Sequence, residues 1–122
     1  MVRVIDCNLR LAGLDATMAL PTLVQTQLTL LESLRFWTRP RAENLRAIVE
    51  AVGLEHLATA ERAGPVVIVA PHYGNWEQLV QWLAARRPLT LIYTRAKFAA
   101  VDAFLRLARE RGGVSAVPAD VH

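Results

Sequence analysis

Hydrophobic and polar positions change their period along the chain, and this change divides it into two parts. In residues 1–62 apolar residues recur every three or four positions opposite polar ones, a pattern typical of amphipathic helices. We expect helices over residues 1–14, 21–37 and 41–52, and a short edge strand over residues 54–57. Gly53 stands where a helix C-cap belongs. The first half of the chain is therefore predicted to be mainly helical.

Residues 63–122 show short, continuous apolar runs in place of the helical period. Residues 66–70 are small or β-branched, which is typical of a strand buried on both faces. Further strands are expected over residues 89–93 and 114–118, with helices over 75–85 and 98–111. Strand, helix and strand in this order form a right-handed parallel crossover. The sequence thus predicts a single α/β domain over residues 1–122, in which N-terminal helices precede a parallel β-α-β-α-β sheet.

The helix over residues 21–37 carries a distinct apolar stripe. This stripe consists of Leu20, Val24, Leu28, Leu31 and Leu34. One interpretation is that the helix packs on the sheet. The other is that it lies on a membrane or lines a groove for an acyl chain.

A histidine follows the first predicted strand at the edge of the sheet where ligands bind in open α/β folds. Pro71 cannot donate to a central ladder, so the strand should stop there and leave His72 in the turn. An imidazole titrates near neutral pH and can accept a proton from a hydroxyl. Glu77, five residues later, could orient the ring through its other nitrogen. His72 and Glu77 are therefore candidate catalytic residues, and purely structural roles for both remain the alternative.

Two cations follow the second predicted strand at the same edge of the sheet. Arg95 and Lys97 suit the binding of a phosphate or the polarisation of a carbonyl, and a solvated basic turn is the alternative. The net charge of +3 likewise suits anionic phosphates or an anionic membrane surface. Basic residues are not interleaved with stacking aromatics, so nucleic acid is not a predicted partner.

The composition argues against a membrane-spanning segment, a disulfide framework and a metal site. The hydrophobic content is 53%, yet no apolar run approaches the ~20 residues that cross a bilayer. Cys7 is the single cysteine, which excludes a disulfide framework and a cysteine metal site. A metal site of His72, Glu77 and His122 would have few ligands, so we predict no metal.

Residues 70–77 read Ala-Pro-His-Tyr-Gly-Asn-Trp-Glu, which resembles the signature of the bacterial lipid A biosynthesis acyltransferases, the lauroyl and myristoyl transferases. In that family a small residue, His, any residue, Gly, Asn, Trp and Glu follow a buried strand. The wider glycerolipid acyltransferases share His-x-x-x-x-Asp and usually carry Asn before the His, where this chain has Pro71. The resemblance implies a partial glycerolipid acyltransferase-like fold, with His72 as general base and Glu77 as its partner.

By the same resemblance, the reaction moves a fatty acyl chain from an acyl carrier protein thioester to a hydroxyl of a lipid A precursor. The implied partners are this carrier protein, the precursor and the membrane surface, with no cofactor besides the thioester, and a coenzyme A ester remains an alternative donor. Arg95 or Lys97 would hold a phosphate of the acceptor. Tyr73 and Trp76 would shape the apolar side of the cleft, and Asn75 is a further substrate-binding candidate besides its expected role as a helix N-cap.

The resemblance covers about the first half of the family's catalytic domain, and the family's N-terminal membrane helix has no counterpart in the sequence. The expected location is the cytoplasmic face of the bacterial inner membrane, with a soluble chain as the alternative. A second hypothesis is a catalytically inactive domain that binds lipid or a protein partner. A homo-oligomer that covers the open sheet edge after Val117 belongs to this hypothesis.

Overall fold

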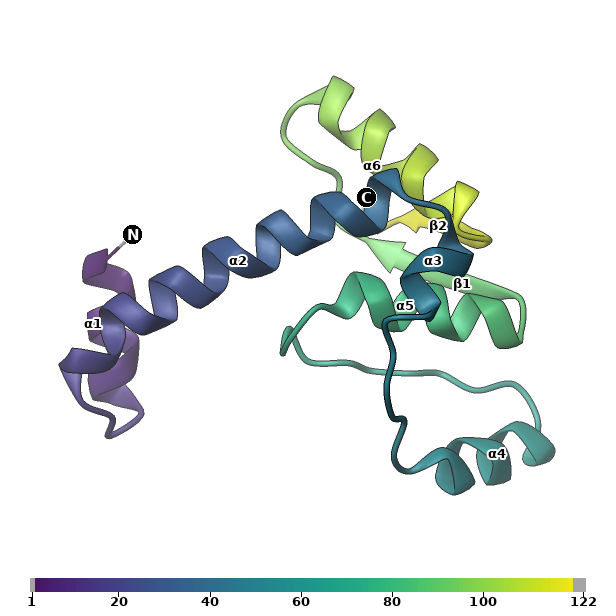
Figure 1. Cartoon of the computed structure of the whole chain (residues 1–122), viewed down its shortest axis with the longest axis horizontal. Coiled ribbons are helices and arrows are strands. Elements are labelled where there is room, and N and C mark those ends of the chain that lie inside the picture. Colours follow the sequence, from purple (N-terminus) through teal and green to yellow (C-terminus); the bar gives the residue numbers. More distant parts are fainter. Residues whose placement is uncertain (1, 120–122) are drawn as a thin grey trace.

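The computed structural model of the chain describes residues 2–119 and shows a helix-rich, mixed α/β fold (Figure 1). Its elements in chain order are α1 (Val2–Leu11), the short 3-10 helix η1 (Ala16–Met18), α2 (Ala19–Thr38), α3 (Arg41–Leu45), α4 (Leu54–Ala63), α5 (Trp76–Arg86), β1 (Leu89–Tyr93), α6 (Ala99–Arg111) and β2 (Val114–Pro118). The predictions are confirmed for three helices and two strands, namely α2, α5, α6, β1 and β2. Their observed ends differ from the predicted ends by no more than two residues.

The sheet consists of β1 and β2, which pair in parallel from Leu89 opposite Val114 to Tyr93 opposite Pro118. Helix α6 connects the two strands and packs on β2, so the parallel β-α-β unit predicted over residues 89–118 is confirmed, whereas the crossover predicted from residues 66–70 through α5 to β1 is wrong. Every second residue of β1 faces inward, ending with the buried Tyr93. Between them, Thr90 and Ile92 are exposed, so the sheet buries one face and not two.

The strand predicted over residues 66–70 is wrong. These residues run extended between α4 and α5 without joining the sheet, and Val67 and Val69 are each 91% exposed. In Figure 1 the segment passes on the side of α5 away from β1. Its backbone therefore meets no strand edge, and β-branched apolar residues form a buried strand only where such an edge accepts their hydrogen bonds. The full β-α-β-α-β sheet does not form within residues 2–119.

The region before α4 also differs from the prediction. The second helix stops at Leu45, and Val49 and Val52 beyond it are exposed. Their apolar face has no surface to pack on, and β-branched residues gain little from helix formation alone. Gly53 adopts φ +79° at the start of α4 and does not end a helix. The edge strand predicted over residues 54–57 is consequently the first turn of α4.

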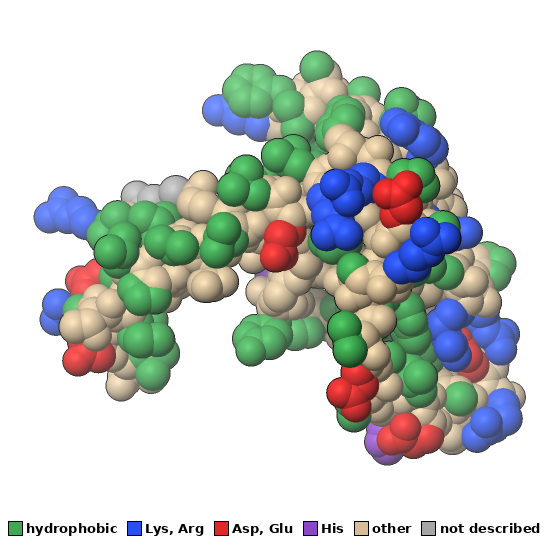
Figure 2. Space-filling model, in the orientation of Figure 1, with side chains coloured by type: hydrophobic (Ala, Val, Ile, Leu, Met, Phe, Trp, Pro, Cys, Tyr) green, Lys and Arg blue, Asp and Glu red, His purple; other side chains and the backbone are tan. Residues whose placement is uncertain are grey.

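Helix α2 extends from the body of the molecule, and α1 packs against its N-terminal end (Figure 1). Phe36 is buried near the C-terminal end of α2, whereas the apolar stripe from Leu20 to Leu34 is exposed. Hydrophobic side chains accordingly gather along this arm in Figure 2. The apolar stripe therefore does not pack on the sheet, and α2 instead contacts α3, α5 and α6 besides α1. Within residues 2–119, no helix is both long and apolar enough to span a bilayer.

Buried polar groups join the elements that surround the sheet. Asn44 of α3 is fully buried and donates to the Gln81 side chain of α5 at 2.9 Å. Gln81 in turn donates to the Phe36 carbonyl of α2 at 2.7 Å. Arg41 donates to the Gly112 carbonyl at 2.8 Å, which satisfies a backbone acceptor at the end of α6. These bonds fix α5 and α6 relative to α2 and α3.

The exposed segment before α5 gives a prediction for stability. Val67→Thr is expected to change the free energy of unfolding by less than about 0.5 kcal/mol, because the side chain is already in water. Val80→Thr on α5 is the matched control, since Val80 is buried and a buried hydroxyl without a partner costs about 1–3 kcal/mol. Urea unfolding measures both. An equal loss at the two positions would indicate that residues 66–70 form a buried strand.

Candidate functional site

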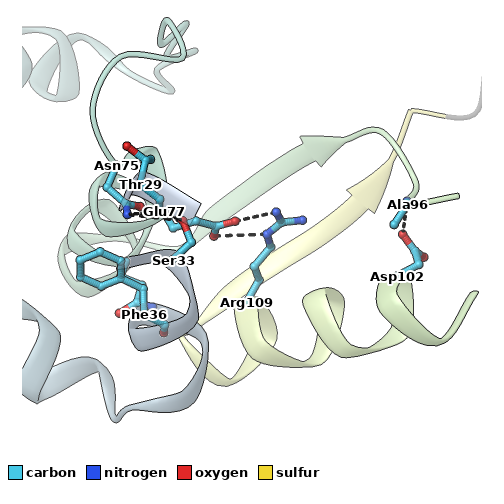
Figure 3. Close-up of polar contacts among 9 residues, drawn as sticks. Thr29, Ser33, Phe36, Asn75, Glu77, Ala96, Asp102 and Arg109 are labelled. Carbon is cyan, nitrogen blue, oxygen red and sulfur yellow. Dashed lines mark hydrogen bonds and ion pairs between the residues drawn. The ribbon is translucent and has the colours of Figure 1, made fainter. Parts of the chain in front are cut away.

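The centre of the site is a buried ion pair between α5 and α6 (Figure 3). Glu77 lies in the first turn of α5 and is 2% exposed, and Arg109 lies in the last turn of α6 and is 7% exposed. Arg109 Nη2 donates to Glu77 Oε1 at 2.7 Å, and Nε donates to Oε2 at 3.4 Å. This two-pronged geometry suits a guanidinium and a carboxylate. Glu77 therefore has a fixed position and a permanent counter-charge.

Two aromatic rings complete the surroundings of Arg109. Its guanidinium carbon lies 5.0 Å from the centre of the Trp76 ring and 5.5 Å from that of Tyr93. Both distances allow a cation–π interaction. Trp76 begins α5 and Tyr93 ends β1, so the guanidinium joins the N-terminus of α5 to the carboxyl end of β1. A cation in the last turn of a helix is usually solvated and has a local explanation in the helix dipole, whereas Arg109 is buried in an ion pair.

His72 lies in the extended segment before α5, and its side chain is exposed. Its ring stands edge-on to Trp76, with 5.9 Å between the ring centroids. Gly74, at φ +64°, makes the turn that brings the chain from His72 into α5, a conformation that suits glycine. Within residues 2–119 the imidazole makes no hydrogen bond, and the Glu77 carboxylate bonds to Arg109. The structure thus brings His72 to Trp76, and a direct bond from His72 to Glu77 stays a prediction.

Asn75 and Tyr73 flank the turn in different ways. Asn75 stands at the N-cap position of α5, as predicted, but its side chain makes no capping bond there. Its Nδ2 instead donates to the Thr29 carbonyl at 3.3 Å and to Ser33 Oγ at 3.4 Å (Figure 3). These acceptors belong to α2 and hold the amide by its nitrogen, while the buried Oδ1 atom has no hydrogen-bond partner among the described residues. Tyr73 points into solvent.

Arg95 and Lys97 lie together between β1 and α6, where they line a cavity of about 500 Å³. Arg106 of α6 lies on the same cavity and adds a cation that the sequence reasoning missed. Asp102 accepts a hydrogen bond from the Ala96 N–H at 2.9 Å (Figure 3) and lies 3.9 Å from the Arg95 guanidinium. The carboxylate thereby fixes the basic turn that leads into α6. This cavity is suited to an anionic group.

A continuous series of contacts connects His72 with this basic cavity. His72 touches Trp76, Arg109 lies between Trp76 and Tyr93, and the Tyr93 hydroxyl is 3.3 Å from Asp102. The side chains of Trp76, Arg109, Tyr93 and Asp102 therefore lie in series between the exposed imidazole and the basic cavity. Chemically, the site offers a group that takes a proton, a rigid buried carboxylate and cations for an anion.

The structure was also searched for groups of side chains that could bind a metal ion. Within residues 2–119, no three His, Cys, Asp or Glu side chains lie close enough together to hold a metal ion. His122, which completed the ligand set considered from the sequence, lies outside the described residues.

One comparison with known proteins identifies a family. The chain matches the family model described as bacterial lipid A biosynthesis acyltransferase over residues 16–120. This match includes His72, Glu77, the basic turn and Arg109. A comparison with curated proteins found no match.

Proposed function

This chain belongs to the bacterial lipid A biosynthesis acyltransferase family, and on that premise we propose that it transfers a fatty acyl chain from an acyl carrier protein thioester to a hydroxyl of a lipid A precursor. The observation that carries the proposal is the position of His72. Its exposed ring packs against Trp76, next to the buried Glu77–Arg109 pair. A base that must reach a substrate hydroxyl needs this combination of access and rigid support.

In the proposed reaction, His72 takes the proton from the acceptor hydroxyl. The hydroxyl oxygen then attacks the carbonyl carbon of the thioester and forms the new ester bond. The carbon–sulfur bond breaks, and the thiolate of the carrier protein leaves and takes the proton from the imidazolium. Atoms and charges balance without a further cofactor.

Glu77 is the proposed partner of His72. The imidazole is exposed and bonded to no described residue, and the proposal requires that it turn from Trp76 towards the fixed carboxylate when substrate binds. Catalytic hydrogen bonds often tighten only when substrate is bound. Arg109 would act as a positioning residue, because it holds Glu77 through two hydrogen bonds.

We further propose that Arg95 or Lys97 binds a phosphate of the acceptor. Both line the basic cavity that a series of contacts connects to His72. Tyr73 and Trp76 would contact apolar parts of the substrates. The proposed setting is the cytoplasmic face of the inner membrane, where the exposed apolar residues of α1 and α2 would lie against lipid.

A second candidate function is binding without catalysis. The observation that favours it is the exposed apolar stripe of α2, which suits lipid, a protein partner or a second copy of the chain. In that case His72 would keep its contact with Trp76 and would have no role in acyl transfer.

An acyl transfer assay tests the proposal. The chain is incubated with a lipid A precursor in mixed micelles and with an acyl carrier protein thioester, or in parallel with the coenzyme A ester. Mass spectrometry is expected to show a precursor that has gained one acyl group, and the faster of the two reactions identifies the donor. Binding of the precursor without any transfer from either donor would support the second candidate.

A further inference from the structure

Trp76 contacts both the candidate base and the ion pair next to it. The His72 ring stands edge-on to the indole, with 5.9 Å between the ring centroids and an interplanar angle of 70°. The Arg109 guanidinium carbon lies 5.0 Å from the centre of the same indole. Both geometries are attractive, the first between aromatic rings and the second between a cation and a ring. The exposed imidazole thus rests on a side chain that the buried Glu77–Arg109 pair supports.

The backbone between His72 and Trp76 is also held in place. Gly74 makes the turn, and Asn75 donates to two acceptors on α2 at 3.3 Å and 3.4 Å (Figure 3). Trp76 then begins α5. In the part of the chain that the structure describes, the ring contact with Trp76 is the one interaction of the His72 side chain. The position of the imidazole therefore depends on the indole.

In this position the imidazole is apart from its proposed partner. The Glu77 carboxylate bonds to Arg109 and makes no hydrogen bond with His72. The proposed reaction requires the ring to turn towards Glu77, so the contact with Trp76 stabilises a position from which proton transfer does not start. A contact made only in the inactive position lowers the population of the active one by the same free energy.

We propose that Trp76 is a positioning residue that holds the general base in an inactive position until the acceptor binds, and that it thereby limits hydrolysis of the acyl donor. This inference rests on the proposed function. A base in the active position can take a proton from water in place of the acceptor, and the water oxygen then bonds to the thioester carbonyl carbon. The carbon–sulfur bond breaks, and the thiolate leaves with the proton from the imidazolium. The products are a free fatty acid and the carrier thiol, and the acyl group is lost to the transfer reaction.

Nuclear Overhauser spectra of the unmodified chain test the contact itself. Cross-peaks between the ring protons of His72 and the indole protons of Trp76 are expected in the free chain. Binding of a lipid A precursor, without any acyl donor, should remove them because the imidazole turns away. The absence of cross-peaks in the free chain, or cross-peaks that persist with the precursor bound, would overturn the proposal.

Two substitutions of Trp76 test the effect on the reaction. Trp76→Leu removes the indole, so hydrolysis of the thioester without acceptor is expected to rise about two- to tenfold, the equivalent of one aromatic contact. Trp76→Phe keeps an aromatic ring and should stay close to the rate of the unmodified chain. Release of free thiol measures both rates. A merely structural role predicts the opposite result, because a loosened site would lower hydrolysis and transfer together.

Trp82→Leu is the matched control. Trp82 also lies on α5 and also carries an arginine over its ring, Arg86 at 4.9 Å, but among residues 2–119 it makes no ring contact with His72. Its substitution should leave the hydrolysis rate and the cross-peaks unchanged. Normal transfer with equal hydrolysis in the Trp76→Leu and Trp82→Leu variants would reject the role of Trp76 alone. The absence of both transfer and hydrolysis in the unmodified chain would instead reject the proposed function.

Discussion

Replacing Arg109 by alanine is expected to lower the free energy of unfolding by about 3–5 kcal/mol. The reason is that the substitution leaves Glu77, which is almost completely buried, without its counter-charge and without two hydrogen bonds. It also removes the cation between Trp76 and Tyr93. Urea unfolding followed by circular dichroism measures the loss. Because Arg109 positions Glu77, acyl transfer should fall as well.

Arg106→Ala is the matched control on the same helix. Its guanidinium is 3.8 Å from Glu110, and both side chains are exposed, so the substitution is expected to cost less than about 0.5 kcal/mol. A double variant, Glu77→Leu with Arg109→Met, should recover much of the stability, because the buried charges are removed together. Equal losses in the Arg106 and Arg109 variants would show that the ion pair does not hold α5 and α6 together.

Replacing His72 by alanine is expected to reduce the rate of acyl transfer by about 10²–10⁴-fold, the usual contribution of a general base. The free energy of unfolding should change by no more than about 0.5 kcal/mol, because the side chain is exposed. Initial rates of ester formation at saturating donor and acceptor measure the effect. This combination of lost activity and unchanged stability distinguishes a catalytic histidine from a structural one.

His56→Ala is the control for this experiment. His56 is an exposed histidine of α4 whose ion-pair partner is the neighbouring Glu55, at 3.4 Å. Its removal should leave both the rate and the stability unchanged. A His72→Ala variant that transfers acyl groups at the full rate would exclude His72 as the base. Substitution of Glu77 cannot replace this test, because loss of its buried carboxylate is expected to lower stability and transfer together.

The sequence predicted the elements whose signals are local. The apolar periodicity of α5 and α6 and the short apolar runs of β1 and β2 were sufficient to place them. The run over residues 66–70 failed because its pattern reports hydrophobicity, while strand formation depends on a neighbouring edge elsewhere in the chain. The end of α3 was missed for a similar reason, since the residues after Leu45 have no surface on which to pack.

Among the site residues, too, those with a local sequence signal were predicted and those that depend on a distant partner were not. His72, Glu77, Arg95 and Lys97 were candidates because each follows a predicted strand or begins a predicted helix, and the structure places the two cations on one cavity. Arg109 was not among the candidates, because a cation in the last turn of a helix has a local explanation in the helix dipole. A better signal was present: position 109 shares a helical face with Leu105 and Asp102, so it belongs to the inward side of α6. Its partner, 32 residues away, was not predictable from spacing.

The most direct test of His72 as the general base is a structure of the chain with a lipid A precursor bound. The His72 imidazole is expected to turn away from Trp76, with one ring nitrogen about 2.6–3.2 Å from an acceptor hydroxyl. The other nitrogen should then face the Glu77 carboxylate. An imidazole that stays against Trp76, with the hydroxyl bonded to another group, would contradict the assignment of His72 as the base.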